Sequence, residues 1–526
     1  MRTFARRLVF ASLFCLPVAA QQPYERIQAN NLKADVNFLA SEEMAGRKTT
    51  SHEARIASNY IASEFLRAGL KPIGDDGSYF QRYDLTQAAQ DDANTSFTVH
   101  SGAQEKSYQL NRDFDLTWIT QTTNPTTATG PLVFLGYGIK APEYGYDDLA
   151  NVDLHGKIAI ILTHEPQESD PASKFMGRWH TYHAYDQYKY EDIRRAGAVG
   201  ILEVIEKKQH RPPAVSSAPR QDWLPDAIYS LPEYWDLPVF EITEEVANEL
   251  LQSSGKTVDG LRKAIDSDLK PQSFYLPNLS ATLKKAYTNR KVVQARNVVG
   301  LVEGSDPKLK DEYVVVSAHY DHLGVVGGRT QFGADDNSSG VASLLEIARA
   351  FAESPVKPRR SVLFVSFDSE EAGLLGSFYY GRHPVLPLDK AAAVLNMDMI
   401  GRNEDTATWQ LSPEYTAQSV NLVGTLYSPT LRRIAEKEND KLHLNLDFKT
   451  DTEDKEEWFA RSDQYVFATR GIPVLLFNTG EHPDYHTEND TWDRLNYPKL
   501  EKIARLVFLV ATDVANRDAR PEFVAH

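Results

Sequence analysis

The stretch EYVVVSAHYDHLG, residues 312–324, decides the fold, because a short apolar run ends there in a cluster of ionisable side chains. From residue 297 to the C-terminus, such β-rich runs alternate with stretches whose apolar residues repeat at helical spacing. The β-rich runs are NVVGLVEG (297–304), EYVVVSAH (312–319), SVLFVSFD (361–368), AAVLNMD (392–398) and IPVLLFNTG (472–480). The helical stretches are residues 338–354, 428–440 and 500–516. This alternation predicts an α/β fold, a mostly parallel twisted sheet with helices on both faces.

Two regions of different character precede this sheet. Residues from about Tyr24 to Leu85 are predicted to be α-helical, and HEARIASNYIASEFLRAG (52–69) has apolar residues at helical spacing and ends at Gly69. From about residue 116 to 283 the sequence is rich in proline, glycine and aromatic residues, with short strand-like runs. His180 and His183 lie there without carboxylates at matching spacing, so we interpret them as surface or packing histidines.

The overall composition is that of a globular protein with several domains. The chain has 526 residues, of which 42% are apolar, and its formal charge is −16. At about 150 residues per domain, two to four domains fit. The acidic balance, without any basic block, argues against a nucleic-acid partner. No stretch reaches the roughly 20 apolar residues of a permanent membrane span, so no stable span is expected.

The first residues have the pattern of a secretory signal peptide, predicted over residues 1–20. Arg2, Arg6 and Arg7 precede an apolar run, and Ala20 is small enough for cleavage. We therefore expect a secreted or periplasmic protein. Cys15, the single cysteine, lies within this segment. Any metal in the mature chain would then be held by histidine and carboxylate, which suits zinc or a harder ion.

Ionisable residues follow the predicted strands where a parallel sheet gathers its ligands, at the carboxyl edge. Singly, each has an ordinary explanation: Asp335 and Asp336 can cap a helix, and Glu370 and Glu371 can be a solvated first turn. Together, so many carboxylates at one edge would be costly without compensating cations. Two divalent ions bridged by one carboxylate can share a hydroxide as nucleophile, with Glu370 and Glu371 as candidate base and ligand. The residues after the strands are His319–His322, Asp335, Asp336, Asp368–Glu371, Asp398, Glu481, His482, Asp484–His486 and Asp490.

Residues 300–515 resemble the catalytic domain of the M28 family of zinc peptidases, mainly aminopeptidases and related carboxypeptidases. The motifs are AHYDHLG (318–324), GADDNSSG (333–340), FDSEEAGLLGS (367–377), LNMDMIG (395–401) and PDYHTENDT (483–491). The middle segment resembles the protease-associated (PA) domain often inserted in this family. The resemblance implies a zinc exopeptidase fold with a β-rich insert. Its expected parts are an N-terminal part of the peptidase domain (21–115), the PA-like insert (116–285) and the catalytic domain (286–526).

The resemblance also implies a metal site. Asp336 would bridge two Zn²⁺ ions, with His319 and Asp398 completing the shell of one and Glu371 and His486 that of the other. Further roles concern residues that do not bind the metal. Glu370 would be the general base, Asp321 a carboxylate that orients the imidazole of His319, and Tyr485 a hydroxyl near the developing oxyanion. Gln464 departs from the histidine that is frequent after the family's Ser-Asp pair.

Several alternatives stay open from the sequence. A metallo-β-lactamase-type site lacks its first histidine because Ser317 occupies that place, while a receptor-like relative would have lost ligands that are all present here. A single-zinc glutaminyl cyclase agrees poorly with the two-ion set and the insert. The main expectation is a zinc aminopeptidase acting on peptides. A carboxypeptidase or dipeptidase of the same fold is the alternative, with Arg329 or Arg402 as a possible clamp for a terminal carboxylate.

Overall fold

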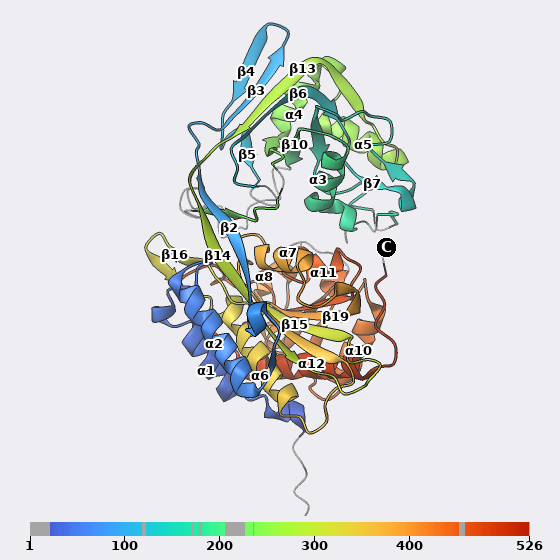
Figure 1. Cartoon of the computed structure of the whole chain (residues 1–526). Coiled ribbons are helices and arrows are strands. Elements are labelled where there is room, and N and C mark those ends of the chain that lie inside the picture. Colours follow the sequence, from blue (N-terminus) through green and yellow to red (C-terminus); the bar gives the residue numbers. More distant parts are fainter. Residues whose placement is uncertain are drawn as a thin grey trace, which may run out of the picture.

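The protein has two lobes, one above the other, and each is built around one large sheet (Figure 1). The computed structural model describes residues 22–117, 122–170, 172–175, 177, 181–205, 227–234, 236–451 and 458–524. The predicted leader (1–20) and His180 lie outside the described residues. Within these ranges, no helix has the length and apolar character needed to cross a membrane.

The sheet of the lower lobe is parallel at its centre, antiparallel pairs flank this centre on both sides, and the outermost pair at one edge is again parallel. The four central strands, β18, β15, β19 and β22, pair in parallel. In order across the sheet, the strands are β11 (Ile228–Ser230), β2 (Phe80–Gln90), β14 (Tyr287–Val302), β18 (Ser361–Phe367), β15 (Tyr313–His319), β19 (Ala391–Met397), β22 (Val474–Asn478), β20 (Ser419–Val423) and β21 (Asn445–Asp447); β1 (Lys71–Pro72) pairs with β14. The β-rich runs predicted from the sequence are thus all strands of one sheet.

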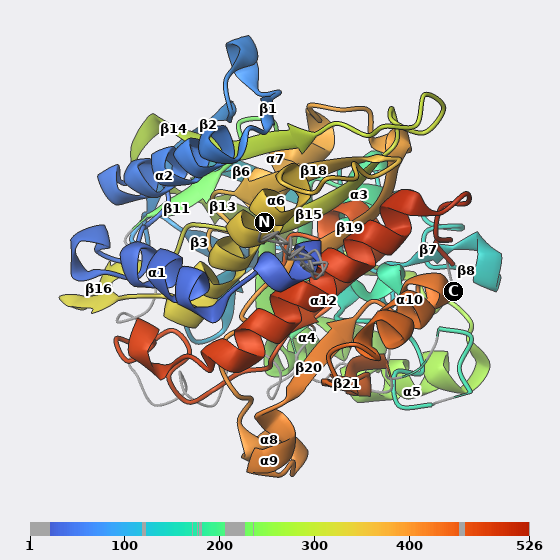
Figure 2. The ribbon, with the colours of Figure 1, turned by 90° about the horizontal axis from the view of Figure 1, so that it is seen from below.

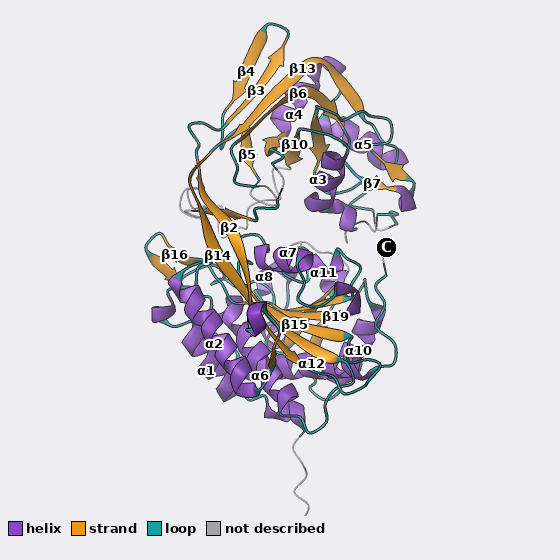
Figure 3. Cartoon of the chain, viewed as in Figure 1, coloured by secondary structure: helices purple, strands orange, loops and turns teal. Residues whose placement is uncertain are grey.

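Helices cover both faces of this sheet, as Figures 2 and 3 show. Alternate residues of β15 enter two separate cores: Val314 and Val316 pack on one face, and Tyr313 and Val315 on the other. A strand buried on both faces needs an unbroken apolar run, which explains its sequence. The first face is covered by α1 (Ala29–Leu39), α2 (His52–Ala68), α6 (Gly340–Ala352), α10 (Pro429–Asn439) and α12 (Tyr497–Asn516), and the second by α7 (Leu375–Arg382) and α11 (Tyr465–Ala468).

Helix α2 ends where the sequence predicts. Ser51 caps its first turn by accepting a hydrogen bond from the amide of Ala54, and Gly69 ends it with a φ of 77° that favours glycine. The predicted helical segment up to Leu85 is wrong at its end, because residues from Phe80 onward belong to β2. Pairing with the long strand β14 is the tertiary interaction that makes this stretch extended.

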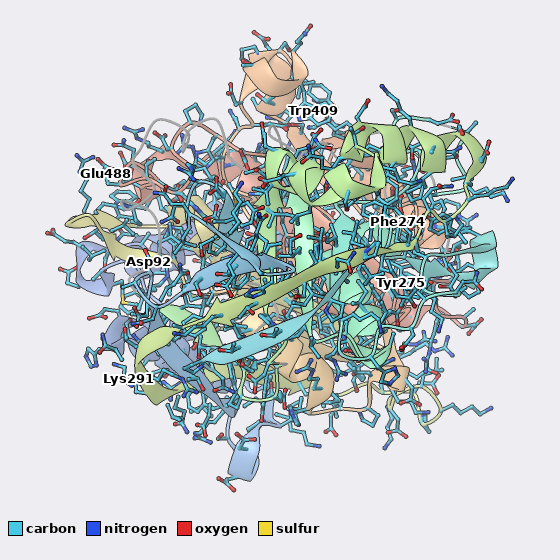
Figure 4. All side chains as sticks on the ribbon, turned by 90° about the horizontal axis from the view of Figure 1, so that it is seen from above. Asp92, Phe274, Tyr275, Lys291, Trp409 and Glu488 are labelled. Carbon is cyan, nitrogen blue, oxygen red and sulfur yellow. The ribbon has the colours of Figure 1, made fainter. Side chains whose placement is uncertain are left out.

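The upper lobe has an eight-stranded mixed sheet with helices on both faces. Helices α4 (Glu244–Leu251) and α5 (Val258–Asp268) pack on one face and α3 (Asp186–Arg195) on the other. Figure 4 shows β13 crossing this lobe, with Phe274 and Tyr275 labelled on it. The strand order is β4 (Gln104–Tyr108), β3 (Ser96–Ser101), β13 (Phe274–Lys285), β6 (Thr126–Phe134), β9 (Ile158–Leu162), β10 (Gly200–Ile205), β12 (Val239–Thr243) and β5 (Phe114–Leu116). This sheet therefore includes β3 and β4, which lie before position 116, and β5, which ends at Leu116.

His183, in the upper lobe, is a packing histidine, as predicted. It is buried, and its Nε2 lies 2.6 Å from Glu143 Oε1. The lobe contacts the lower one through aromatic rings: the ring of Tyr185 lies 5.2 Å from that of Tyr465 and 6.2 Å from that of Phe459.

Candidate metal centre

The candidate site lies at the carboxyl edge of the four central parallel strands. His319 is the last residue of β15, and Glu370 and Glu371 follow β18. Asp398 comes directly after β19. Because these strands run in parallel, their carboxyl ends reach the same edge. Asp336 lies in an irregular turn, η9 (Ala334–Ser339), immediately before α6, and His486 lies in the loop after β22.

Three of the predicted ligands form one group. His319 Nε2 lies 3.3 Å from Asp336 Oδ1 and 3.3 Å from Asp398 Oδ1. The three side chains are almost fully buried, with relative exposures of 1%, 3% and 5% for His319, Asp336 and Asp398. Buried charges of this kind need either mutual pairing or a cation.

A second group uses the other oxygen of the same aspartate. His486 Nε2 lies 3.0 Å from Asp336 Oδ2 and 3.4 Å from Glu371 Oε2. Two atoms that bind one tetrahedral zinc at about 2.0–2.1 Å stand roughly 3.3 Å apart. The separations in both groups match that value, so the donor set fits two zinc ions that share Asp336.

His322 belongs to the second group, and sequence reasoning gave it no role. Its Nδ1 lies 2.7 Å from Glu371 Oε1 and 3.7 Å from Asp336 Oδ2. Its ligand-capable nitrogen falls within 4.8 Å of those of Asp336, Glu371 and His486. The only sequence signal was its place three residues after His319 in AHYDHLG.

Glu370 and Glu371 are neighbours in the chain with opposite electrostatics. Burial raises the pKa of the Glu370 carboxyl well above its usual range, and the negative charges of Asp398 and Glu371 act in the same direction. Burial also disfavours the charged form of Glu371, but His486 and His322 outweigh it and lower the pKa of Glu371 to about 2. Glu370 is therefore suited to hold a proton, and Glu371 to remain an anion. Glu370 Oε2 lies 3.9 Å from His319 Nε2.

Asp321 contacts both His319 and the backbone of the neighbouring residues Glu370 and Glu371. Its carboxylate accepts hydrogen bonds from the amides of Glu370 (3.0 Å) and Glu371 (3.3 Å). His319 Nδ1 lies 3.2 Å from the carbonyl oxygen of Asp321, whereas a carboxylate oxygen of the same residue lies 3.7 Å away. The orienting contact expected from the carboxylate is thus made at shorter range by the backbone of the same residue.

A second carboxylate, Asp490, fixes the backbone of the shared aspartate. It accepts hydrogen bonds from the amides of Asp335 (2.9 Å) and Asp336 (3.2 Å). Asp335 does not cap α6, because its carboxylate instead accepts from the amide of Gly401 at 2.6 Å. The loop that carries His486 is thereby tied to the turn that carries Asp336.

Arg47, near the amino-terminal end of the chain, stabilises the backbone around the metal-ligand candidates. Its guanidinium is buried, with 1% relative exposure, and donates to four backbone carbonyls. The acceptors belong to Leu39, Tyr320, Phe332 and Gly333, at 2.6–3.0 Å. The segment before α2 therefore holds the residues beside both His319 and Asp336.

Tyr485 lies against His486, with ring centroids 3.8 Å apart and an interplanar angle of 27°. Its hydroxyl oxygen accepts a hydrogen bond from Arg461 Nη2 at 3.3 Å.

Gln464, at the position of the family's frequent histidine, is fully buried, and its Oε1 accepts a hydrogen bond from Asn396 Nδ2 at 2.9 Å. Gln464 thus forms part of the buried packing beneath the sheet edge.

Three residues at the site have left-handed backbone conformations. Ser369, just before Glu370, has a φ of 64°; Met399, just after Asp398, has a φ of 54°; and His486 itself has a φ of 54°. Such conformations cost about 1–3 kcal/mol each and cluster at functional sites. Two of these bends thus lie next to Glu370 and Asp398, and the third lies at His486 itself.

The profile of Peptidase family M28 matches residues 297–511, a range that contains every residue of the two groups. Residues 297–511 thus match an M28 peptidase domain. Over 278 residues the chain is 27% identical to Aminopeptidase YwaD of Bacillus subtilis (strain 168), covering 51% of this chain and 54% of that one. It is 29% identical over 209 residues to the Probable glutamate carboxypeptidase AMP1 of Arabidopsis thaliana, covering 39% and 27%.

The fold extends beyond the M28 domain. The solved structure of an aminopeptidase from Aneurinibacillus sp. strain AM-1 matches 96% of this chain and 97% of its own, with a TM-score of 0.50 and 20% identity. That likeness shows the shared fold, consistent with the predicted fold class. The sequence alignment spans about half the length of the B. subtilis protein and less of the plant protein.

Proposed function

We propose that this protein is a zinc-dependent exopeptidase that uses two ions and removes the amino-terminal residue of peptides. The observation that carries the proposal is Asp336, whose two carboxylate oxygens face two separate pairs of ligand-type side chains. A mononuclear site needs no such bridge. His319 and Asp398 would hold one ion, and Glu371 and His486 the other.

Zinc bound there would supply Lewis-acid polarisation of the scissile carbonyl and a lowered pKa for the attacking water. Side chains of the protein would supply the proton transfer and the contact with the oxyanion. Glu370 would accept the proton of that water and pass it to the leaving amine. Tyr485 would orient its O–H towards the developing oxyanion, because its hydroxyl oxygen is already engaged by Arg461.

The choice of an amino-terminal bond rests on the arginines. Arg402 Nη2 lies 2.6 Å from Asp484 Oδ2, and Arg329 Nη1 lies 2.9 Å from Glu488 Oε1. Each candidate carboxylate clamp is therefore already paired with a carboxylate of the protein. In Figure 4, Glu488 lies at the periphery of the molecule, so its pair with Arg329 is a surface contact.

One observation favours the carboxypeptidase or dipeptidase alternative. The side chain of Arg461 is 32% exposed and contacts Tyr485 beside the site, where a cation can bind a terminal carboxylate. It is also paired with Glu481 at 3.0 Å. This alternative therefore requires substrate to compete with Glu481 for the guanidinium.

The deciding experiment compares two substrate classes on the zinc-loaded protein, with and without chelator. A panel of aminoacyl p-nitroanilides tests for a free amino terminus, and acyl-blocked dipeptides test for a free carboxyl terminus. We expect chelator-sensitive hydrolysis of the first class. Hydrolysis of blocked dipeptides alone would establish the carboxypeptidase alternative, and chelator-insensitive activity would reject the metal mechanism. Secretion or export, predicted from residues 1–20, is part of the proposal and is tested by sequencing the amino terminus of exported protein.

A further inference from the structure

We propose that His322 is a positioning residue that orients Glu371 and does not bind the metal itself. The inference rests on the proposed function, since it concerns the second ion of the pair. The question arises because His322, Asp336, Glu371 and His486 all present ligand-type atoms to one point. A zinc ion there would have four protein ligands if His322 binds it, and three if it does not. Four ligands make a closed structural site, whereas catalytic zinc keeps an open position.

Distances distinguish a ligand from a hydrogen-bond partner. Atoms that share one tetrahedral zinc at about 2.0–2.1 Å stand roughly 3.3 Å apart. The contacts among the predicted ligands range from 3.0 to 3.4 Å. The contact of His322 Nδ1 with Glu371 Oε1 is 2.7 Å, and its distance to Asp336 Oδ2 is 3.7 Å. The first value is that of a charge-assisted hydrogen bond and is too short for two ligands of one ion.

The surroundings of His322 assign the proton to Nδ1. Its side chain is fully buried, and Nε2 has no hydrogen-bond partner among the residues that the structure describes. A proton on Nε2 would leave a buried N–H without an acceptor, which costs about 1–3 kcal/mol. A proton on Nδ1 instead donates to Glu371 Oε1. Glu371 Oε2, 3.4 Å from His486 Nε2, is then the oxygen left to bind the ion.

The backbone holds the imidazole in this place. The amide of His322 donates to the carbonyl of Arg47 at 3.2 Å. On the ring's other side, a Cβ at Gly333 would come within 2.5 Å of His322 Cδ2, and Gly333 has a φ of 59°. The ring of His486 lies 5.6 Å away at an angle of 70°. His322 therefore has little freedom to turn from Glu371 towards the ion.

The first test counts the imidazoles bound to zinc in the wild-type protein. X-ray absorption of the protein loaded with two equivalents of zinc should give two imidazole ligands per chain, those of His319 and His486. Three imidazoles would overturn the proposal, because His322 would then be a ligand. A wild-type chain that retains no zinc after dialysis would reject the proposed function itself, which separates the two failures.

The second test compares His322→Asn with His322→Leu. The amide of asparagine places an N–H near the position of Nδ1, whereas leucine has no donor. By chelator competition, we expect His322→Leu to bind one of the two zinc ions about 10–100-fold more weakly, and His322→Asn to stay within about threefold of wild type. Equal binding by His322→Leu and wild type would overturn the positioning role. Equal weakening in both variants, with unchanged melting of the metal-free proteins, would also overturn it.

Discussion

The two lobes share one structural feature, a set of neighbouring parallel strands, but the side chains near the strand ends differ. Each has four neighbouring parallel strands: β18, β15, β19 and β22 below, and β6, β9, β10 and β12 above. Both sets bring several strand ends to one edge. Yet the two metal-capable groups found among the described residues both lie in the lower lobe.

Two buried carboxylates of the upper lobe, Asp148 and Glu165, are satisfied locally. Asp148 accepts hydrogen bonds from the amides of Tyr137 (3.0 Å) and Ile139 (3.2 Å) and from the hydroxyl of Tyr146 (2.8 Å). Glu165, just after β9, accepts from the amide and hydroxyl of Thr181. In the lower lobe, by contrast, carboxylates and imidazoles face one another across a common centre. Parallel strands thus bring their ends to one edge of a sheet. Whether that edge can bind a metal depends on the partners of each carboxylate there.

The largest expected effect comes from removing the shared carboxylate. Asp336→Ala should lose both zinc ions and lower kcat/KM by about a thousandfold or more, because the metals supply several kcal/mol of transition-state stabilisation. Zinc content by mass spectrometry and hydrolysis of aminoacyl p-nitroanilides check this. Asp92→Ala, at an exposed position labelled in Figure 4, is the control and should retain both. Retention of two ions by Asp336→Ala would contradict the bridge.

Substitutions of the two neighbouring glutamates should separate the loss of proton transfer from the loss of metal binding. Glu370→Gln should keep two zinc ions and lower kcat by at least about a hundredfold, as for loss of a general base. Glu371→Gln should instead lose affinity for one ion, because its carboxylate is an expected ligand. Steady-state kinetics and zinc titration on the same preparations measure both. Near-normal turnover of Glu370→Gln would remove that residue from the role of base.

In the upper lobe, the matching substitution should affect stability alone. Asp148→Ala leaves the buried amides of Tyr137 and Ile139 without their acceptor, so the free energy of unfolding should fall by about 2 kcal/mol or more. Because this charge is satisfied locally, zinc content and kcat/KM per folded molecule should not change. Chemical denaturation and active-site titration test the two halves. A large loss of zinc would show that the lobes are not independent in this respect.

The smallest effect is expected at Arg329. Its side chain is 70% exposed and pairs with Glu488, so Arg329→Ala should change KM by less than about twofold for either substrate class. A KM increase of tenfold or more, confined to acyl-blocked dipeptides, would instead identify Arg329 as a carboxylate clamp. That result would favour the carboxypeptidase alternative.

Local patterns were enough to predict the central strands, and the M28 resemblance implied the candidate ligands. The apolar runs at 312–319 and 361–368 are short, bounded by turns and buried on both faces, so their sequence carries the strand signal by itself. The residues named as ligands stand immediately after such runs or within motifs of the M28 resemblance. Their chain positions therefore predicted a shared edge before any contact was known.

Other contacts join segments that no local pattern connects. Arg47 contacts carbonyls more than 270 positions away, and Asp490 binds the amide of Asp336 from 154 positions away. The role of His322 depends on a 2.7 Å contact with Glu371, and the pairing of Arg402 with Asp484 joins two loops. The stretch from Phe80 is a strand because β14 lies beside it.

By itself, the sequence determined the central strands of the lower sheet and the side chains that follow them, because periodicity and turn residues act over a few positions. Only the tertiary structure decided which charges meet, which are satisfied by amides, and which oxygen of each carboxylate is left for a metal. Those outcomes depend on differences of a few tenths of an ångström between segments far apart in the chain. Such distances are set by packing around the sheet and leave no trace in a local pattern.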